Sequence, residues 1–307
     1  MRNIKLTQVD AFTNKLFGGN PSAVVFEAEV LSEDEMRDIA REMNLSETAF
    51  ILPSKKGNIR LRYFTPNGDE IKFCGHASVG ALYSIAKEHE LGIKGPGVYR
   101  LQVETNIGLL PMQIDYLDEE NIVIQFDSPK IDLVQCNYSH KLVAKKLGIE
   151  PGIIDQSKLI MREKTNDFIY LTIKSLKELE SINYNVQSAT EFAKAENIVV
   201  FCLITNQTFD KENQLHSRCF APLVGVPEDP ATGSAQGALV AYALVNNILL
   251  ENTEYIFLEQ GHFIKRPSQL KVKIVKQDVN YRATVYASAV EVFRTEIALP
   301  QRVSILT

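Results

Sequence analysis

Two segments of the chain, residues 76–89 and 234–247, carry apolar or small side chains on most faces of a helix. A helix that is apolar nearly all round must be surrounded by protein. Alternating or continuous apolar runs elsewhere predict the strands that would do this, at residues 4–12, 23–26, 49–52, 59–64, 122–126, 198–204, 256–258, 270–275 and 283–293. We therefore expect an α+β fold in which curved, mostly antiparallel, barrel-like sheets each wrap a central helix.

Further helices are predicted from start signals and periodicity. Ser32 and Glu35 have the spacing of a capping box, which predicts a helix to about Met43. The polar segment 44–48 then ends that helix and leads into the strand at 49–52. Residues 139–147, 176–182 and 188–195 also have helical character.

The chain contains an internal similarity between residues 62–82 and 218–239. Each copy has an Arg-x-Phe-x-Pro motif, a polar loop, a glycine, and a segment of small residues that ends in Gly-Ala-Leu. Repeats have to be recognised before a fold is assigned. The matched positions are Arg62 with Arg218, Phe64 with Phe220, Pro66 with Pro222, Gly75 with Gly233, and Gly80 with Gly237.

This repeat predicts two similar lobes, residues 1–128 with about 288–307 and residues 129–287, with an active site in the cleft between them. Small residues at the helix starts, Gly80 and Gly237 among them, would let the sheets approach closely. The matched Arg62 and Arg218 favour a structural role at the interface of the two lobes.

Composition narrows the class of protein. The 307 residues are 45% hydrophobic and 23% charged, with a net charge of −5 and no Lys/Arg-rich run, which disfavours nucleic acid as a partner. The longest nearly apolar stretch, 235–250, is too short and polar to span a bilayer. Four cysteines without CxxC spacing imply neither a zinc site nor a disulfide framework. The N-terminus lacks a signal-peptide apolar region, so we expect a cytoplasmic protein.

The candidate binding groups lie at the starts of the two apolar helices. Backbone N–H groups at a helix N-terminus bind anions, and Gly75 and Gly233 stand directly upstream of the two predicted helices. The alternative for each glycine is a tight turn without a ligand. Because the arrangement occurs twice, it favours a site for a small substrate that carries a carboxylate.

Ionisable residues stand at the same loops: His76 at the first helix, and Asp229 and Ser234 at the second. Glu47 lies between a predicted helix and a strand, with Leu45 and Phe50 close by. Apolar surroundings would raise the pKa of this carboxyl and suit it to general acid–base work. A solvated loop carboxylate is the alternative.

Several motifs resemble one known family. They are Gly19-Asn-Pro-Ser-Ala-Val, Leu45-Ser-Glu-Thr-Ala-Phe, Phe64-Thr-Pro, Cys74-Gly-His-Ala, Phe220-Ala-Pro, Glu228-Asp-Pro-Ala-Thr-Gly-Ser-Ala and Gln260-Gly-His-Phe-Ile-Lys-Arg-Pro-Ser. In this order and over residues 19–268, the chain resembles the PhzF-like phenazine-biosynthesis isomerases, which share the diaminopimelate epimerase fold.

The resemblance implies an isomerase that moves a hydrogen on a small anionic substrate without a metal or an organic cofactor. It implies Glu47 as the proton carrier, assisted by His76, Asp229 and Ser234. A homodimer is expected by analogy. The positions expected to bind substrate are Asn20, Cys74, Gly75, Ala77, Thr232 and Gly233.

Two alternatives stay open. A cofactor-free amino-acid epimerase of this fold uses two thiols, and Cys74 stands at the first of those positions. Thr232 stands at the second, however, and a hydroxyl is too weak an acid to replace a thiol. We therefore interpret Cys74 as a small buried core residue. A non-catalytic protein that binds small anions would also use the two helix starts.

Overall fold

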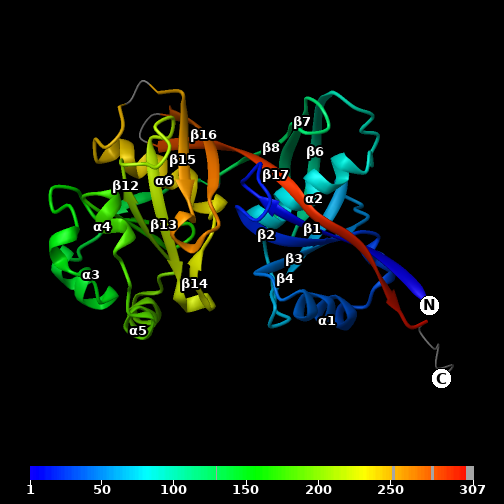
Figure 1. The fold of residues 1–307 in the computed structure, drawn as a ribbon, viewed down its shortest axis with the longest axis horizontal. Helices are drawn as coiled ribbons and strands as arrows, with labels where there is room; N and C mark the ends of the chain where they lie inside the picture. The colour runs from blue at the N-terminus through cyan, green and yellow to red at the C-terminus, as the bar shows by residue number, and fades with distance from the viewer. Residues whose placement is uncertain (129, 251–252, 278–279, 302–307) are drawn as a thin grey trace. The chain divides into compact units, whose positions relative to one another are not determined.

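The structure is a computed structural model that describes residues 1–128, 130–250, 253–277 and 280–301 (Figure 1). The chain divides into two compact units. Unit 1 consists of Met1–Phe17, Pro21–Gln125 and the chain from Ser288 onward, and unit 2 consists of Gly18–Asn20 and Phe126–Ala287.

The predicted lobes, 1–128 with about 288–307 and 129–287, place the first division three residues later than the structure does and keep Gly18–Asn20 in the first lobe. Positions 129, 251–252, 278–279 and 302–307 of these lobes lie outside the described residues. The shared active site stays a prediction.

Unit 1 is a mixed sheet with a helix on each face. Its antiparallel pairs are β1–β17, β3–β4, β4–β5 and β6–β7, and its parallel pairs are β2–β3 and β4–β6. Its elements are β1 (Arg2–Ala11), β2 (Asn20–Val25), η1 (Ala28–Val30), α1 (Glu33–Met43), β3 (Glu47–Leu52), β4 (Ile59–Phe64), β5 (Glu70–Ile71), α2 (Gly75–Lys87), β6 (Gly97–Thr105), β7 (Gly108–Tyr116), β8 (Ile122–Asp127) and the end of β17 (Asn280–Leu299).

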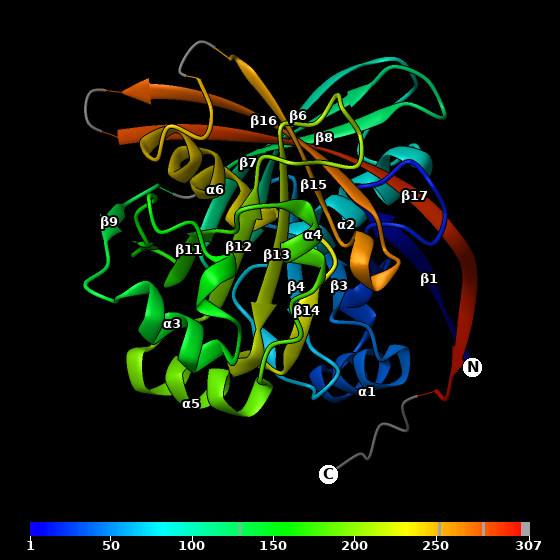
Figure 2. The same cartoon turned by 60° about the vertical axis from the view of Figure 1, so that its left-hand side comes forward.

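Helix α2 is the central helix of unit 1. All of its residues from Gly75 to Ala86 are buried, and it packs against β1, β3 and β7 (Figures 1 and 2). Gly80 permits the close approach, because a Cβ there would lie 2.6 Å from the Ser22 hydroxyl oxygen on β2. This confirms the predicted reason for small residues near the helix start.

Helix α1 covers the other face of the sheet. Ser32 and Glu35 form the predicted capping box, with Ser32 N donating to Glu35 Oε2 at 2.8 Å. Met36, Ile39 and Ala40 pack into a core with strand residues that include Phe50 and Phe64. The apolar stripe of α1 thus anchors the strand that begins at Glu47.

The hairpin of β6 and β7 is absent from the sequence-based prediction. Its two nine-residue strands pair in full register from Gly97–Tyr116 to Thr105–Gly108. The inward positions alternate as Leu101, Val103 and Thr105 on β6. Outward positions between them are charged or polar, and this alternation was the available signal.

Unit 2 is also a mixed sheet. Antiparallel pairs join β9–β10, β10–β11, β12–β13, β13–β14, β15–β16 and β16–β17, and parallel pairs join β11–β12 and β13–β15. Its elements are β9 (Leu133–Gln135), α3 (His140–Leu147), η2 (Pro151–Ile153), β10 (Met161–Glu163), β11 (Phe168–Thr172), α4 (Leu176–Glu180), α5 (Val186–Glu196), β12 (Val200–Thr205), β13 (Leu215–Ala221), η3 (Pro222–Val224), β14 (Val226–Asp229), α6 (Gly233–Val245), β15 (Tyr255–Gln260), η4 (His262–Ile264), β16 (Ser268–Gln277) and the start of β17.

The strands of unit 2 separate two layers of helices. Ile169 and Leu171 of β11 pack into one core with α3 and α5. The alternate residue Tyr170 faces α6, where its hydroxyl donates to Ala235 O at 3.1 Å and its ring stacks on Tyr242. Successive side chains of a strand point to opposite faces, so β11 is buried on both. Helix α6 is the counterpart of α2.

The repeated arginines form ion pairs inside their own units. Arg62 on β4 pairs with Glu70 on β5, and Arg218 on β13 pairs with Glu228 on β14. Each guanidinium carbon also lies 5.0 Å from the ring centre of the phenylalanine two residues on. These contacts explain the Arg-x-Phe repeat through each unit's own packing, and the expected interface role stays a prediction.

Among the described residues, the helices are too short or too polar to cross a bilayer.

Candidate active site

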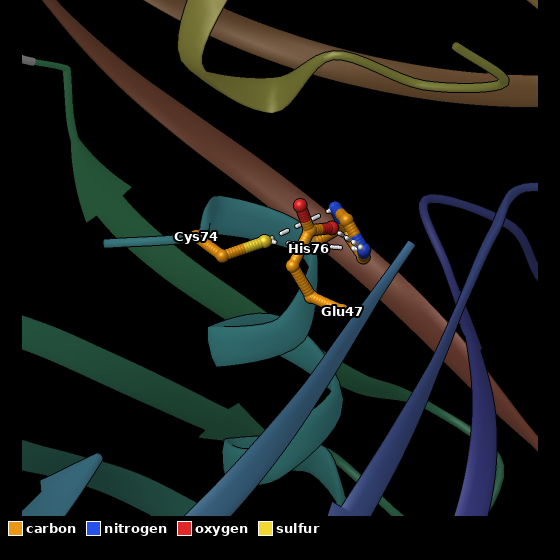
Figure 3. A group of neighbouring side chains, drawn as sticks. All are labelled: Glu47, Cys74 and His76. Carbon is orange, nitrogen blue, oxygen red and sulfur yellow. Dashed lines mark hydrogen bonds and ion pairs between the residues drawn. The ribbon is translucent and has the colours of Figure 1, made fainter. Parts of the chain in front are cut away.

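The first group of predicted residues meets where β3 and α2 begin, within unit 1. Glu47 is the first residue of β3, and Cys74 precedes the first residue of α2. His76 is the second residue of that helix. Figure 3 shows the side chains of Glu47, Cys74 and His76 turned toward one another. We call these three residues, together with Ser46, the Glu47 cluster.

Short contacts hold the Glu47 cluster together. Nε2 of His76 lies 3.2 Å from Oε2 of Glu47 and 3.2 Å from the hydroxyl oxygen of Ser46. The Cys74 sulfur lies against the same ring, 3.3 Å from Nδ1 and 3.9 Å from Nε2. The side chains of His76 and Glu47 are only 8% and 17% exposed, so water screens these contacts little.

Buried hydrogen bonds of the Ser78 hydroxyl hold the first turn of α2 in place. The Ser78 hydroxyl donates to Cys74 O at 2.7 Å and also lies 2.6 Å from the Tyr63 hydroxyl. All three residues are buried. A rigid helix start therefore presents the thiol and the imidazole side by side.

The charge state of the cluster differs from the expectation for Glu47. Burial raises its pKa, but the hydrogen bond and the positive charge of His76 act in the opposite direction and leave that pKa below its ordinary value of 4.5. The predicted raised pKa is therefore wrong, because that prediction considered the apolar neighbours of Glu47 and not the charge of His76.

The pKa of His76 is shifted toward the cationic form. Burial lowers its pKa, but contacts with Cys74 and Glu47 outweigh burial and raise the pKa well above its ordinary 6.5. Burial and the charge of Glu47 raise the pKa of the Cys74 thiol. Glu47 and His76 thus favour each other's charged form, while burial and Glu47 favour the neutral thiol of Cys74.

The second group of predicted residues meets before α6, within unit 2. Asp229 ends β14, and its carboxylate accepts hydrogen bonds from Asn20 Nδ2 at 2.8 Å and from the Thr232 hydroxyl at 2.5 Å. The Thr232 hydroxyl is thus committed to Asp229 rather than to capping α6. Together with Gln260, these residues form what we call the Asp229 cluster.

Gln260 ties this cluster together, and the sequence prediction did not include it as a site residue. Its Nε2 donates to Asp229 O at 2.7 Å and to the Thr232 hydroxyl at 3.1 Å. Its Oε1 accepts from Gln236 Nε2 at 3.0 Å. The side chain is fully buried. Its place beside Gly261-His in one of the recognised motifs was the only available signal.

The remaining predicted residues lie at the two helix starts. Gly75 and Gly233 are the first residues of α2 and α6. Ala77 is buried in the first turn of α2, and the half-buried Ser234 is the second residue of α6. Ser46, whose hydroxyl contacts His76, was missed although it stands next to Glu47.

Within the described part of the chain, a second set of possible metal donors consists of His216, Glu259 and His262. Nδ1 of His216 lies 3.0 Å from Glu259 Oε1. The carboxylate also accepts from Asn213 Nδ2 at 2.9 Å and from two backbone N–H groups. Because hydrogen bonds already occupy both oxygens, the set fits a buried structural carboxylate better than a metal site.

Comparison with solved structures defines the class of protein. A crystal structure of the Bacillus anthracis phenazine biosynthesis protein of the PhzF family is 29% identical, with a TM-score of 0.87 over 97% of this chain and 100% of that one. A hydroxyproline epimerase from Agrobacterium vitis, 10% identical with a TM-score of 0.60 over 97% and 93% of the two chains, shows the fold alone. The class is an isomerase of the diaminopimelate epimerase-like α+β fold, as predicted.

The family follows from the sequence. The family model described as phenazine biosynthesis-like protein matches residues 9–295, and the chain belongs to this family. An uncharacterised isomerase of Clostridium acetobutylicum is 32% identical over 309 residues, covering 97% of this chain and 99% of the relative. The uncharacterised isomerase YddE of Escherichia coli K12 is 30% identical, covering 95% and 97%.

Proposed function

We propose that this protein is a cofactor-independent isomerase that moves a proton on a small, carboxylate-bearing substrate, with Glu47 as the general acid–base residue. The observation that carries the proposal is the 3.2 Å contact between the half-buried Glu47 carboxylate and the His76 ring at the first turn of α2, which favours the charged form of each. A base of this kind can remove a proton from a carbon next to a carboxyl or an unsaturated group.

The surroundings suit the charge that such a step creates. Proton removal leaves negative charge on a substrate oxygen, and the N–H groups of the first turn of α2 with the His76 cation would stabilise it. A substrate carboxylate next to His76 would also compete with Glu47 for the imidazolium. That competition raises the pKa of Glu47 and makes it a stronger base when substrate is bound.

The roles of Asp229 and Ser234 in the same reaction are part of this proposal, as are substrate contacts by Asn20, Thr232 and Gly233. The hydrogen bonds that orient the Asp229 carboxylate support a positioning or proton-transfer role. The small anionic substrate, the homodimer, the cytoplasmic location and the lack of nucleic-acid and membrane partners stay predictions.

The test is deuterium uptake from D₂O, followed by NMR on a panel of small cyclic carboxylates that includes proline, trans-4-hydroxyproline and cyclohexadiene carboxylates. We expect exchange at carbon for at least one compound and a loss of about 10²–10⁴-fold in Glu47→Gln. Glu42→Gln, the same change at an exposed position of α1, is the matched control.

Three outcomes would contradict the proposal. Exchange that survives in Glu47→Gln would remove Glu47 from the chemistry. Inversion at a single carbon that depends on Cys74 but not on Glu47 would favour an epimerase. Binding of the panel without any exchange would favour a non-catalytic anion-binding protein.

A further inference from the structure

The Glu47 cluster holds a second group that can transfer a proton. The Cys74 sulfur lies 3.3 Å from Nδ1 of His76, and Nε2 of the same ring lies 3.2 Å from Oε2 of Glu47. One ligand atom from each of the three side chains lies within 4.8 Å of the others. Only 8% of the surface of Cys74 is exposed, and that residue directly precedes the first turn of α2.

We propose that Cys74 is a second catalytic acid–base residue: Glu47 takes a proton from one substrate atom, and Cys74 delivers a proton to another atom on the same face of the substrate. This inference rests on the proposed function and specifies its chemistry. It replaces the interpretation of Cys74 as a core residue alone.

The step balances without a further reactant. A substrate C–H bond breaks and an O–H bond forms on Glu47, while the electron pair moves through the conjugated substrate. The S–H bond of Cys74 breaks, and a new C–H bond forms at the second atom. The Glu47 proton then returns to the Cys74 thiolate, whose sulfur lies within 4.8 Å of a carboxylate oxygen, and this restores the starting state.

The charges of the cluster couple the two transfers. The negative charge of Glu47 is, after burial, the main cause that raises the pKa of Cys74. When Glu47 takes up the substrate proton, this charge disappears and the thiol becomes a stronger acid. The positive charge of His76, whose ring lies 3.3 Å from the sulfur, then stabilises the thiolate. The thiol is thus activated at the stage when it has to donate.

The separation of the two groups indicates the geometry of the reaction. Reacting heavy atoms approach to about 3–3.5 Å, so an acid and a base on opposite faces of one carbon stand about 6–7 Å apart. The Glu47 and Cys74 ligand atoms lie within 4.8 Å. This spacing fits proton transfer at two positions on one face, which is a transposition, and not inversion at a single carbon.

The experiment uses the substrate found in the D₂O panel and follows two signals: deuterium uptake at the first carbon and formation of the isomerised product. We expect Cys74→Ser to retain deuterium uptake within about threefold and to lose product formation by at least about 100-fold, because Glu47 still works while a hydroxyl is too weak an acid. Serine is a good N-cap, so this variant should keep the start of α2.

Two further variants complete the design. Glu47→Gln should lose both signals, because the first transfer fails. Cys136→Ala, which removes a thiol that packs against the core of unit 2, is the matched cysteine control and should lose neither. A second measurement follows Cys74 itself: Glu47→Gln should speed alkylation of Cys74 by iodoacetamide at pH 8 about tenfold, measured on the peptide by mass spectrometry.

The outcomes separate the two proposals. Two results would overturn the role of Cys74 and leave Glu47 as the single proton carrier. One is product formation by Cys74→Ser within tenfold of the wild type, and the other is a Cys74 alkylation rate that is the same in Glu47→Gln as in the wild type. If the wild type exchanges no compound of the panel, the proposed function fails, and the role of Cys74 fails with it.

Discussion

Arg218 binds Glu228 through two parallel contacts, with Nε 3.0 Å from Oε1 and Nη2 2.7 Å from Oε2. The pair is nearly buried, with side chains 9% and 10% exposed. Nη1 of the same guanidinium donates to the carbonyl oxygens of Leu179 and Ile182 at 2.8 Å each. One side chain therefore joins β13, β14 and the end of α4.

Removing this arginine should destabilise unit 2 strongly. Arg218→Met removes the ion-pair partner of the nearly buried Glu228 side chain, which costs about 3–5 kcal/mol. Urea unfolding measures the loss. The matched variant Arg62→Met leaves Glu70, which is 21% exposed, and should cost about 1 kcal/mol. Equal losses at the two positions would contradict the importance that we give to burial.

The charge state of His76 can be measured directly. We expect the His76 ring to titrate above 6.5 in an NMR titration of its carbon-bound protons. In Glu47→Gln its pKa should fall, because one of the contacts that raise it is lost while burial persists. The Ser46→Ala variant keeps the carboxylate and serves as the control. A His76 pKa unaffected by Glu47→Gln would contradict the ion pair.

The same pair predicts how stability depends on pH. Folding lowers the pKa of Glu47. Its contribution to the free energy of unfolding is therefore complete above the pKa that Glu47 has in the unfolded chain, and it is lost as pH falls through the pKa in the folded protein. Folding raises the pKa of His76. Its contribution to the free energy of unfolding is therefore complete below pH 6.5, the ordinary pKa of the side chain, and it is lost as pH rises through the pKa in the folded protein.

The difference in unfolding free energy between wild type and Glu47→Gln should therefore be largest at mildly acidic pH, near 4.5–6.5, and shrink on both sides. Urea titrations across this range measure it. If this difference in unfolding free energy is constant with pH, Glu47 and His76 do not stabilise each other's charged form.

Those parts of the fold that depend on local pattern were predictable from the sequence. The two central helices follow from apolar residues on nearly all faces, and the start of α1 follows from Ser32 and Glu35. The repeated Gly80 and Gly237 indicated where sheets approach the helices. Membership in the isomerase family followed from motifs in a fixed order.

The sign of the Glu47 pKa shift was not predictable in this way. It depends on whether a cation lies within hydrogen-bonding distance, and residues 47 and 76 are brought together only by the fold. The role of Gln260 was hidden for the same reason, since its partners Asp229 and Thr232 are about thirty positions away. The direction of the Glu47 pKa shift and the role of Gln260 thus depend on contacts between residues distant in sequence, which local patterns do not predict.

The close approach at Gly237 makes it the less replaceable of the two repeated glycines. A Cβ there would lie 2.2 Å from the Ser128 hydroxyl oxygen and 2.8 Å from its Cβ, and 2.9 Å from the Cβ of Ala283. At Gly80 the tight contact is to the Ser22 hydroxyl alone. Gly237→Ala should therefore cost about 1–3 kcal/mol, and Gly80→Ala less, in thermal or urea unfolding. Ser128→Gly should restore part of the loss at Gly237, and a larger cost at Gly80 would contradict this ranking.

Gln260 should fix the conformation of the segment that carries Asp229. Gln260→Leu keeps the side-chain volume roughly constant but removes the donor to Asp229 O and the acceptor that faces Thr232 N at 3.3 Å. Buried groups left without partners cost about 1–3 kcal/mol, and the segment before α6 bears that cost directly. We therefore expect amide hydrogen exchange of residues 229–233 to accelerate by at least about tenfold, while exchange in α2 stays unchanged.

Gln269→Leu, at an exposed position of β16, provides the matched control. If Gln260→Leu accelerates exchange throughout unit 2, the glutamine supports the whole core; if exchange at 229–233 is unaffected, it does not hold the Asp229 cluster in place.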